Sequence, residues 1–218
     1  MDLLEFARGP GLLWALAIMV FGIAWRLVAI LLLQWRSDLS APRSNRTMRG
    51  AVRLMIMRSW PHKEFLPKTW FSELAGWTFH LGFFAVLLLF VPHILFIEGI
   101  LGISWPGLPN WLIYALGVVT VFALLGVLVR RLRHPVLRLL SNFDDYFSWL
   151  VTIAPVATGL TLSAYLGMHK ETLLAVHLLS VELLMVWFPF SKLMHAFFIW
   201  ASRGITGAAF ARKGISPQ

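Results

Sequence analysis

The chain has no cysteine among its 218 residues. Disulfide bonds, thiolate-bound zinc, iron–sulfur clusters and covalently attached c-type haem are therefore excluded, because each of them needs a cysteine sulfur. Any metal or cofactor that this chain binds must be held by histidine or by the packing of side chains around it.

Charged residues are also scarce, at 13% of the chain, whereas hydrophobic residues make up 59% and the mean hydropathy is +0.76. Soluble domains contain about 25% charged residues, so this composition predicts an integral membrane protein. Acidic residues are fewer than basic residues, which leaves a net charge of +9. In a soluble protein this excess would favour nucleic acid. Here the basic residues flank apolar segments, so we expect membrane lipid and no nucleic acid.

Five apolar segments are long enough to cross about 30 Å of hydrocarbon at about 1.5 Å per residue. We expect helices near 10–33, 71–97, 110–129, 146–166 and 172–200. The predicted fold class is an all-α, five-helix membrane bundle that forms a single domain over 1–218. The first segment is not expected to be a cleaved signal peptide, because MDLLEFARG starts with acidic residues and the apolar stretch is too long.

The distribution of basic residues predicts how the bundle is oriented. Two connections and the C-terminal tail carry fifteen of them, whereas the opposite side carries only Arg8 and Lys170. The positive-inside rule then puts the N-terminus outside and the C-terminus in the cytoplasm, in the cell inner (plasma) membrane. The fifteen residues are Arg36, Arg43, Arg46, Arg49, Arg53, Arg58, Lys63, Lys68, Arg130, Arg131, Arg133, Arg138, Arg203, Arg212 and Lys213.

The segment SNFDDYFSW (141–149) precedes the fourth expected helix and supplies residues suited to a helix start. Ser and Asn side chains accept hydrogen bonds from the first free amides of a helix, and acidic residues in the first turn interact favourably with its dipole. We therefore expect Ser141, Asn142, Asp144 and Asp145 to cap this helix.

Four of the seven histidines fall inside expected membrane helices: His80 and His93 on the second, His177 and His195 on the fifth. Ionisable side chains within a span are costly and usually face the bundle interior with a partner. Because the two helices are antiparallel, His80 lies at the depth of His195, and His93 at the depth of His177. Two histidines at each of two depths predict two stacked bis-histidine haem groups. The others, expected at the surface, are His62, His134 and His169.

Helical geometry supports a shared face for the two histidines of the fifth helix better than for the two histidines of the second. His177 and His195 are 18 residues apart, which is five turns, so they lie on one stripe about 27 Å apart. His80 and His93 are 13 residues apart, about 20 Å along the axis but about 140° out of phase on a straight helix. Pro92 can kink the helix and reduce this mismatch. The alternative for His93 is an interfacial residue hydrogen-bonded to water.

The number of ligands favours haem over a bare metal ion. Zinc needs three or four ligands at one depth, and only two histidines are expected at each. A porphyrin takes two axial ligands from opposite sides, and apolar side chains supply its other contacts. Two histidine ligands leave no position for oxygen and suit the iron to single-electron transfer.

The segments FHLGFF (79–84) and VHLLSVELLMVWFPFSKLMH (176–195) resemble the gamma subunit of membrane-bound respiratory nitrate reductase. The resemblance covers most of the chain. It extends to related membrane cytochromes that accompany iron–sulfur subunits of the heterodisulfide-reductase type, including that of the Dsr sulfur-metabolism complex. It implies that His80 and His195 bind the cytoplasmic-side haem b, and that His177 binds the outer haem.

The chain departs from the nitrate reductase pattern in the second expected helix (71–97), where Phe90 stands at the position of that family's second histidine. Either His93 takes that role or the outer haem has been lost. A lysine linked to quinone in nitrate reductase has no obvious counterpart. These differences favour the heterodisulfide-reductase-linked branch, to which the segment DDYF and the tail RGITGAAFARKG are also similar.

Two basic residues are candidate partners for the propionates of the cytoplasmic-side haem. Lys192 lies one turn before His195, and Arg26 lies at a similar depth late in the first helix. The alternatives are snorkelling of Lys192 to the interface and anchoring of Arg26 among lipid head groups.

Three glutamates are candidates for proton transfer. The family resemblance places quinol oxidation beside the outer haem, where Glu98 is the nearest carboxylate and the candidate catalytic residue. Glu182 lies between the two haem levels, where it either transfers protons or hydrogen-bonds a neighbouring helix. Glu73 is expected to start a helix.

Three functions remain open. The favoured one is a haem b subunit of a respiratory quinol:acceptor oxidoreductase, with two haem b groups, or one at minimum. It would exchange electrons between the quinone pool and a cytoplasmic iron–sulfur partner of the heterodisulfide-reductase type docked on the basic inner face. The second is a membrane anchor with one haem or none. The third is a small transporter that uses the histidines as a proton path.

Overall fold

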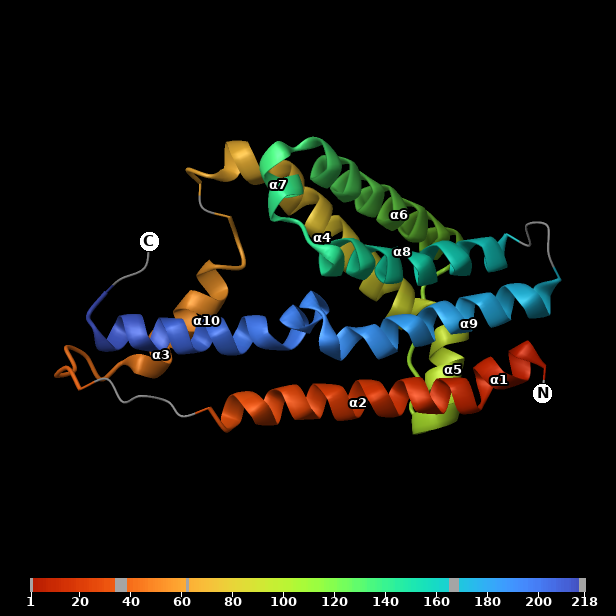
Figure 1. Cartoon of the computed structure of the whole chain (residues 1–218), viewed down its shortest axis with the longest axis horizontal. Helices are drawn as coiled ribbons and strands as arrows, with labels where there is room; N and C mark the ends of the chain where they lie inside the picture. The colour runs from red at the N-terminus through yellow and green to blue at the C-terminus, as the bar shows by residue number, and fades with distance from the viewer. Residues whose placement is uncertain (1, 34–38, 62, 165–168, 216–218) are drawn as a thin grey trace. The chain divides into compact units, whose positions relative to one another are not determined.

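The computed structural model describes residues 2–33, 39–61, 63–164 and 169–215, and the regular structure within these ranges is helical (Figure 1). Five helices there are long and apolar enough to cross a membrane: Leu3–Leu31, Leu66–Leu89, Asn110–Arg133, Phe143–Ser163 and Lys170–Phe190. Their positions agree with the five predicted segments, but two of those segments are interrupted. Arg36, His62 and positions 165–166 of the predicted fourth helix lie outside the described residues.

Several shorter helices join or follow the spans. The membrane-length elements are α1 (Leu3–Arg8) with α2 (Pro10–Leu31), α4 (Leu66–Leu89), α6 (Asn110–Arg133), α8 (Phe143–Ser163), and α9 (Lys170–Trp187) with the 3-10 helix η1 (Phe188–Phe190). The others are α3 (Thr47–Met57), α5 (Val91–Leu101), α7 (Pro135–Leu140), η2 (Lys192–Met194) and α10 (His195–Arg212).

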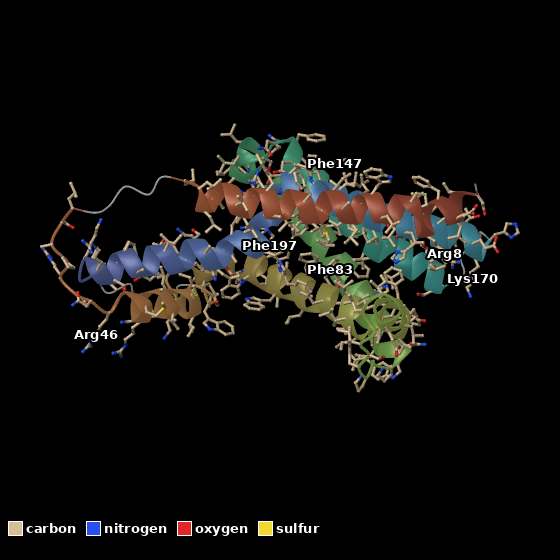
Figure 2. All side chains as sticks on the ribbon, turned by 90° about the horizontal axis from the view of Figure 1, so that it is seen from below. Arg8, Arg46, Phe83, Phe147, Lys170 and Phe197 are labelled. Carbon is tan, nitrogen blue, oxygen red and sulfur yellow. The ribbon has the colours of Figure 1, made fainter. Side chains whose placement is uncertain are left out.

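The chain divides into two compact units: Met1–Val20 with Trp70–Phe188, and Phe21–Thr69 with Pro189–Gln218. In the first unit α8 packs against both α6 and α9, and α1 packs against α9. Arg8, the last residue of α1, and Lys170, the first residue of α9, lie at the same end of that unit (Figure 2). In the second unit α3 packs along α10.

The helices of the first unit bury small and β-branched residues and expose large apolar ones. Val151 on α8 and Thr120 on α6 are fully buried, whereas Trp14 and Phe122 are more than two-thirds exposed. Large apolar side chains on the outside of a helical bundle match a hydrocarbon surrounding. This pattern agrees with the membrane character indicated by the composition.

The predicted second helix is interrupted in the structure. α4 ends at Leu89, Phe90 takes an extended conformation with φ −83° and ψ 123°, and α5 begins at Val91 with Pro92 in its first turn. Proline has no amide hydrogen and clashes with the preceding turn, so it is tolerated at the start of a helix and not in its interior. The kink predicted at Pro92 is therefore a complete break, which gives α5 a direction independent of α4.

The carbonyl groups left free at the end of α4 have partners from the following segment. Trp105 donates from Nε1 to the carbonyl oxygen of Leu88 at 2.6 Å. The backbone amide of Leu108 donates to the carbonyl oxygen of Leu89 at 2.8 Å. Because the last carbonyls of a helix have no partner within it, these bonds allow the chain to break inside an apolar region.

The predicted fifth helix is also interrupted, at residues 188–194. α9 gives way to η1, which contains the buried Pro189, and Ser191 is extended before η2. The Ser191 side chain accepts a hydrogen bond from the amide of Leu193 at 3.2 Å. At Pro189 the structure therefore has a change of helix type.

The start of α8 confirms the predicted cap for Asn142 and the two aspartates, whereas Ser141 ends α7 and its hydroxyl donates to the carbonyl oxygen of Leu137 at 2.6 Å. Asn142 accepts a hydrogen bond from the amide of Asp145, and the Asp145 carboxylate accepts one from the amide of Asn142. Asp145 also forms a salt bridge with Arg131 at 3.1 Å, and Asp144 accepts a hydrogen bond from Ser148 at 2.7 Å. The two aspartates therefore hold the end of this helix.

Gly82 allows α4 to approach α6 closely. A Cβ atom at Gly82 would collide with the hydroxyl of Thr120 and lie 3.3 Å from the carbonyl oxygen of Leu116. We expect Gly82→Ala to lower the free energy of unfolding by about 1–3 kcal/mol, seen as a lower thermal midpoint in detergent. Gly76→Ala is the matched control on α4, because a Cβ there meets nothing within 4 Å. Equal midpoints for the two variants would contradict the expectation.

Candidate functional site

The rings of His93 and His177 lie opposite each other within the first unit. Their centroids are 6.2 Å apart and their planes differ by 8°. His93 comes from α5, and His177 comes from α9. The structure thus brings together the two histidines for which straight-helix geometry gave the poorer fit, because the break at Phe90 frees α5 from the phase of α4.

The spacing of this pair leaves room for one metal atom between the rings. An imidazole nitrogen binds a metal at about 2.0 Å and lies about 1.1 Å from its ring centre, so two imidazoles on opposite sides of one metal have centroids about 6.2 Å apart. The observed separation of 6.2 Å equals this estimate. This separation is large enough for one metal atom to be held between the two imidazoles.

His93 is held by residues at the break between α4 and α5, which also sets the direction of α5. Its Nδ1 atom lies 3.0 Å from the carbonyl oxygen of Val86, one of the free carbonyls at the end of α4. The ring of Phe90 packs edge-on against the imidazole with centroids 5.3 Å apart. A carbonyl oxygen only accepts hydrogen bonds, so Nδ1 carries the proton and Nε2 carries the lone pair.

His177 is held by side chains of the neighbouring helix α8. Its Nδ1 atom lies 3.1 Å from Oγ1 of Thr158. Next to Thr158, Gly159 provides space for the ring, because a Cβ atom there would lie 3.2 Å from Cε1 of His177. The ring therefore fits against α8 only where that helix has no side chain.

His80 and His195 each direct Nδ1 to a backbone carbonyl, as His93 does. Nδ1 of His80 lies 2.7 Å from the carbonyl oxygen of Gly76, and Nδ1 of His195 lies 2.8 Å from that of Lys192. In both rings Nδ1 must be the donor, which gives Nε2 the lone pair for a metal. Metal-binding histidines in general hold their second nitrogen in this way. His80 belongs to the first unit and His195 to the second, so their pairing stays a prediction.

Clusters of metal ligands larger than a pair do not occur among the described residues, where no group of three or more His, Asp or Glu side chains is placed to hold a metal ion. A bare zinc ion would need such a group. The pair of His93 and His177 offers two protein ligands.

The remaining predicted site residues lie on helix surfaces. Glu98 is exposed in the last part of α5, five residues after His93. The guanidinium of Arg26 lies over the ring of Phe198, 5.6 Å from its centroid. Phe198 is on α10 three residues after His195, so Arg26 lies near that histidine within the second unit. Lys192 is exposed, and its carbonyl is the one that His195 contacts.

Glu182 on α9 is buried, with 7% of its surface exposed. Its Oε2 atom faces α2, where a Cβ on Gly11 would lie 2.8 Å away. Its Oε1 atom is buried and has no hydrogen-bond partner within the described part of the chain. The hydrogen bond to a neighbouring helix that the sequence allowed is thus absent for this oxygen.

An unsatisfied buried oxygen costs about 1–3 kcal/mol, so we expect Glu182→Met, which keeps the volume, to raise the thermal midpoint in detergent. Glu171→Met is the control, because Glu171 is exposed on the same helix. A lower midpoint for the Glu182 variant would mean that this carboxyl group has a partner that stabilises it.

Sequence reasoning identified the four histidines but missed the residues that hold two of them. The carbonyl of Val86 and the pair Thr158–Gly159 act only through tertiary contacts. A threonine beside a glycine in an apolar helix is ordinary packing material, so no signal in the sequence marked it.

Comparison with known proteins gives a relative along nearly the whole chain. A protein of Nitratidesulfovibrio vulgaris (strain Hildenborough), whose printed name is simply "Protein", is 31% identical over 219 residues. The matched region covers 95% of this chain and 93% of that protein. No family model and no solved structure matches the chain.

Proposed function

This chain belongs to the same family as the Nitratidesulfovibrio vulgaris protein, and we propose that it is a membrane haem b electron-transfer subunit of a respiratory-type complex. It would exchange electrons between the quinone pool and a cytoplasmic iron–sulfur partner. The observation that carries the proposal is the pair His93 and His177, with parallel rings 6.2 Å apart. The second haem would be held by His80 and His195.

Haem b, when bound, supplies an iron that passes single electrons. His93 and His177 would hold this haem as its two protein ligands, which would leave no position for oxygen. The hydrogen bonds from Nδ1 to Val86 and Thr158 keep each ring in the tautomer that binds through Nε2. His93 and His177 are both half-buried among apolar helices, which would limit the access of water to the site.

Charged residues around the inner site would complete it. Arg26, whose guanidinium lies over the ring of Phe198, and Lys192 would neutralise the carboxylates of a haem held by His195. At the other depth, Glu98 is proposed to accept a proton as quinol is oxidised, because it lies beyond His93 on α5. Its exposed position would let the proton leave to the outer side.

The paired helices α3 and α10 would form the docking surface for the partner. Their residues include Arg49, Arg53, Arg203 and Arg212 and no acidic side chain. The two helices are held close by Gly50 and Gly207, since a Cβ at Gly50 would lie 2.5 Å from the carbonyl oxygen of Gly207. We propose that this surface faces the cytoplasm, as the positive-inside rule predicts. Binding of an acidic partner there would weaken as salt is added.

The direct test is the haem content of the purified protein, followed by reduction with a soluble quinol analogue. We expect two haem b groups per chain by the pyridine haemochrome assay, and both should become reduced by quinol. One haem with no quinol reduction would fit an anchor subunit. A pure protein with no haem that conducts protons in vesicles would contradict the proposal and favour the transporter.

A further inference from the structure

Thr158 is the residue of α8 that contacts the imidazole of His177. Its hydroxyl lies 2.7 Å from the carbonyl oxygen of Ala154, to which it donates, and 3.2 Å from that of Pro155. A hydroxyl has one hydrogen and a carbonyl only accepts, so this hydrogen points into the backbone of α8. The lone pairs of Oγ1 are then left to accept from Nδ1 of His177, 3.1 Å away.

Ser180 extends the contact to the backbone of α9. Its hydroxyl donates to the carbonyl oxygen of His177 at 2.6 Å and lies 3.0 Å from Oγ1 of Thr158. The imidazole of His177 is thus set in one orientation by polar groups on one edge and by the close approach of Gly159.

The contact differs from those of the other three histidines. His80, His93 and His195 each direct Nδ1 to a backbone carbonyl, which no side-chain substitution removes. His177 directs Nδ1 to a side-chain hydroxyl. Among these four histidines, His177 is therefore the one whose Nδ1 contact a side-chain substitution can remove without moving the backbone.

We propose that Thr158 is a positioning residue that sets the reduction potential of the haem held by His93 and His177. The inference rests on the proposed function, because it concerns that haem. An acceptor on Nδ1–H makes an imidazole a stronger electron donor to its metal, which stabilises oxidised iron relative to reduced iron. The hydroxyl of Thr158 therefore lowers the potential of this haem.

The experiment is a redox titration of the full-length protein carrying Thr158→Val, which keeps the shape of the side chain and removes the acceptor. At a fixed ambient potential we expect the ratio of reduced to oxidised outer haem to rise about tenfold, a shift of about 59 mV for one electron. The other haem should not change. Thr158→Ser should restore the original potential, because it restores the hydroxyl.

Thr161→Val is the matched control, since Thr161 is an exposed threonine on α8 whose hydroxyl bonds the carbonyl of Thr158 and not the histidine. Loss of one haem in Thr158→Val with retention in Thr158→Ser would also support the positioning role. Two haems with unchanged potentials in Thr158→Val, or a serine variant that behaves like valine, would overturn it. Absence of haem from the wild type would instead overturn the proposed function.

Discussion

Replacing His177 with alanine is expected to lower the haem content of the purified protein from two groups per chain to one. The variant loses one axial ligand, and His93 alone offers a single bond to the iron from the other side. Both rings belong to one compact unit and already lie 6.2 Å apart. The pyridine haemochrome assay measures the loss, and His93→Ala should give the same result.

The control for this prediction is His134→Ala, because His134 is exposed between α6 and α7 and lies outside the spans. It should leave the haem content unchanged. A smaller substitution, His177→Gly, tests whether the loss is a folding defect, since free imidazole added during expression should then restore part of the haem. Full haem content in both His93 and His177 variants would show that the pair does not bind haem.

The second large effect is expected from the other pair. His80→Ala and His195→Ala should each remove the second haem and leave the first, because the ligands of the first come from other helices. Electron transfer from quinol to the cytoplasmic acceptor should fall by at least about a hundredfold, the upper range for loss of a residue near a metal. A redox titration of each variant should show a single component with the potential of the His93–His177 haem.

Comparison of the two variants tests whether His80 and His195 hold the same haem. If His80 and His195 hold one haem, the variants must lose the same spectral component and must not add to each other when combined. Variants that lose different components, or a double variant that has lost more haem than either single one, would show that the two histidines do not share a group.

The break at Phe90 shows where sequence reasoning was limited. Pro92 marked the position and predicted a kink, and a kink could only reduce the mismatch of about 140° between His80 and His93. The actual break depends on Trp105 and Leu108, which supply hydrogen bonds to the free carbonyls of α4. These partners lie more than ten residues away, and no local rule connects them to the proline.

A similar limit applies to the residues around His177. The five-turn spacing to His195 and the membrane setting marked this histidine from the sequence. The partner of its Nδ1 atom is chosen by how α8 packs on α9, where Gly159 permits close approach and thereby places Thr158 beside the ring. Helix packing is set by many small contacts at once, so a single sequence does not specify which threonine will face which histidine.

The amino-acid sequence by itself determined that the chain is suited to a membrane, the number and approximate position of the membrane helices, and the residue type available for metal binding. These properties follow from the composition and from the length and residue spacing of single segments, so they depend on residues that are close in the sequence. The tertiary structure alone decided that His93 faces His177, that their rings are parallel, and which atoms hold their second nitrogens. Those outcomes depend on helix breaks and interhelical packing, where energies of contacts between distant residues set the geometry.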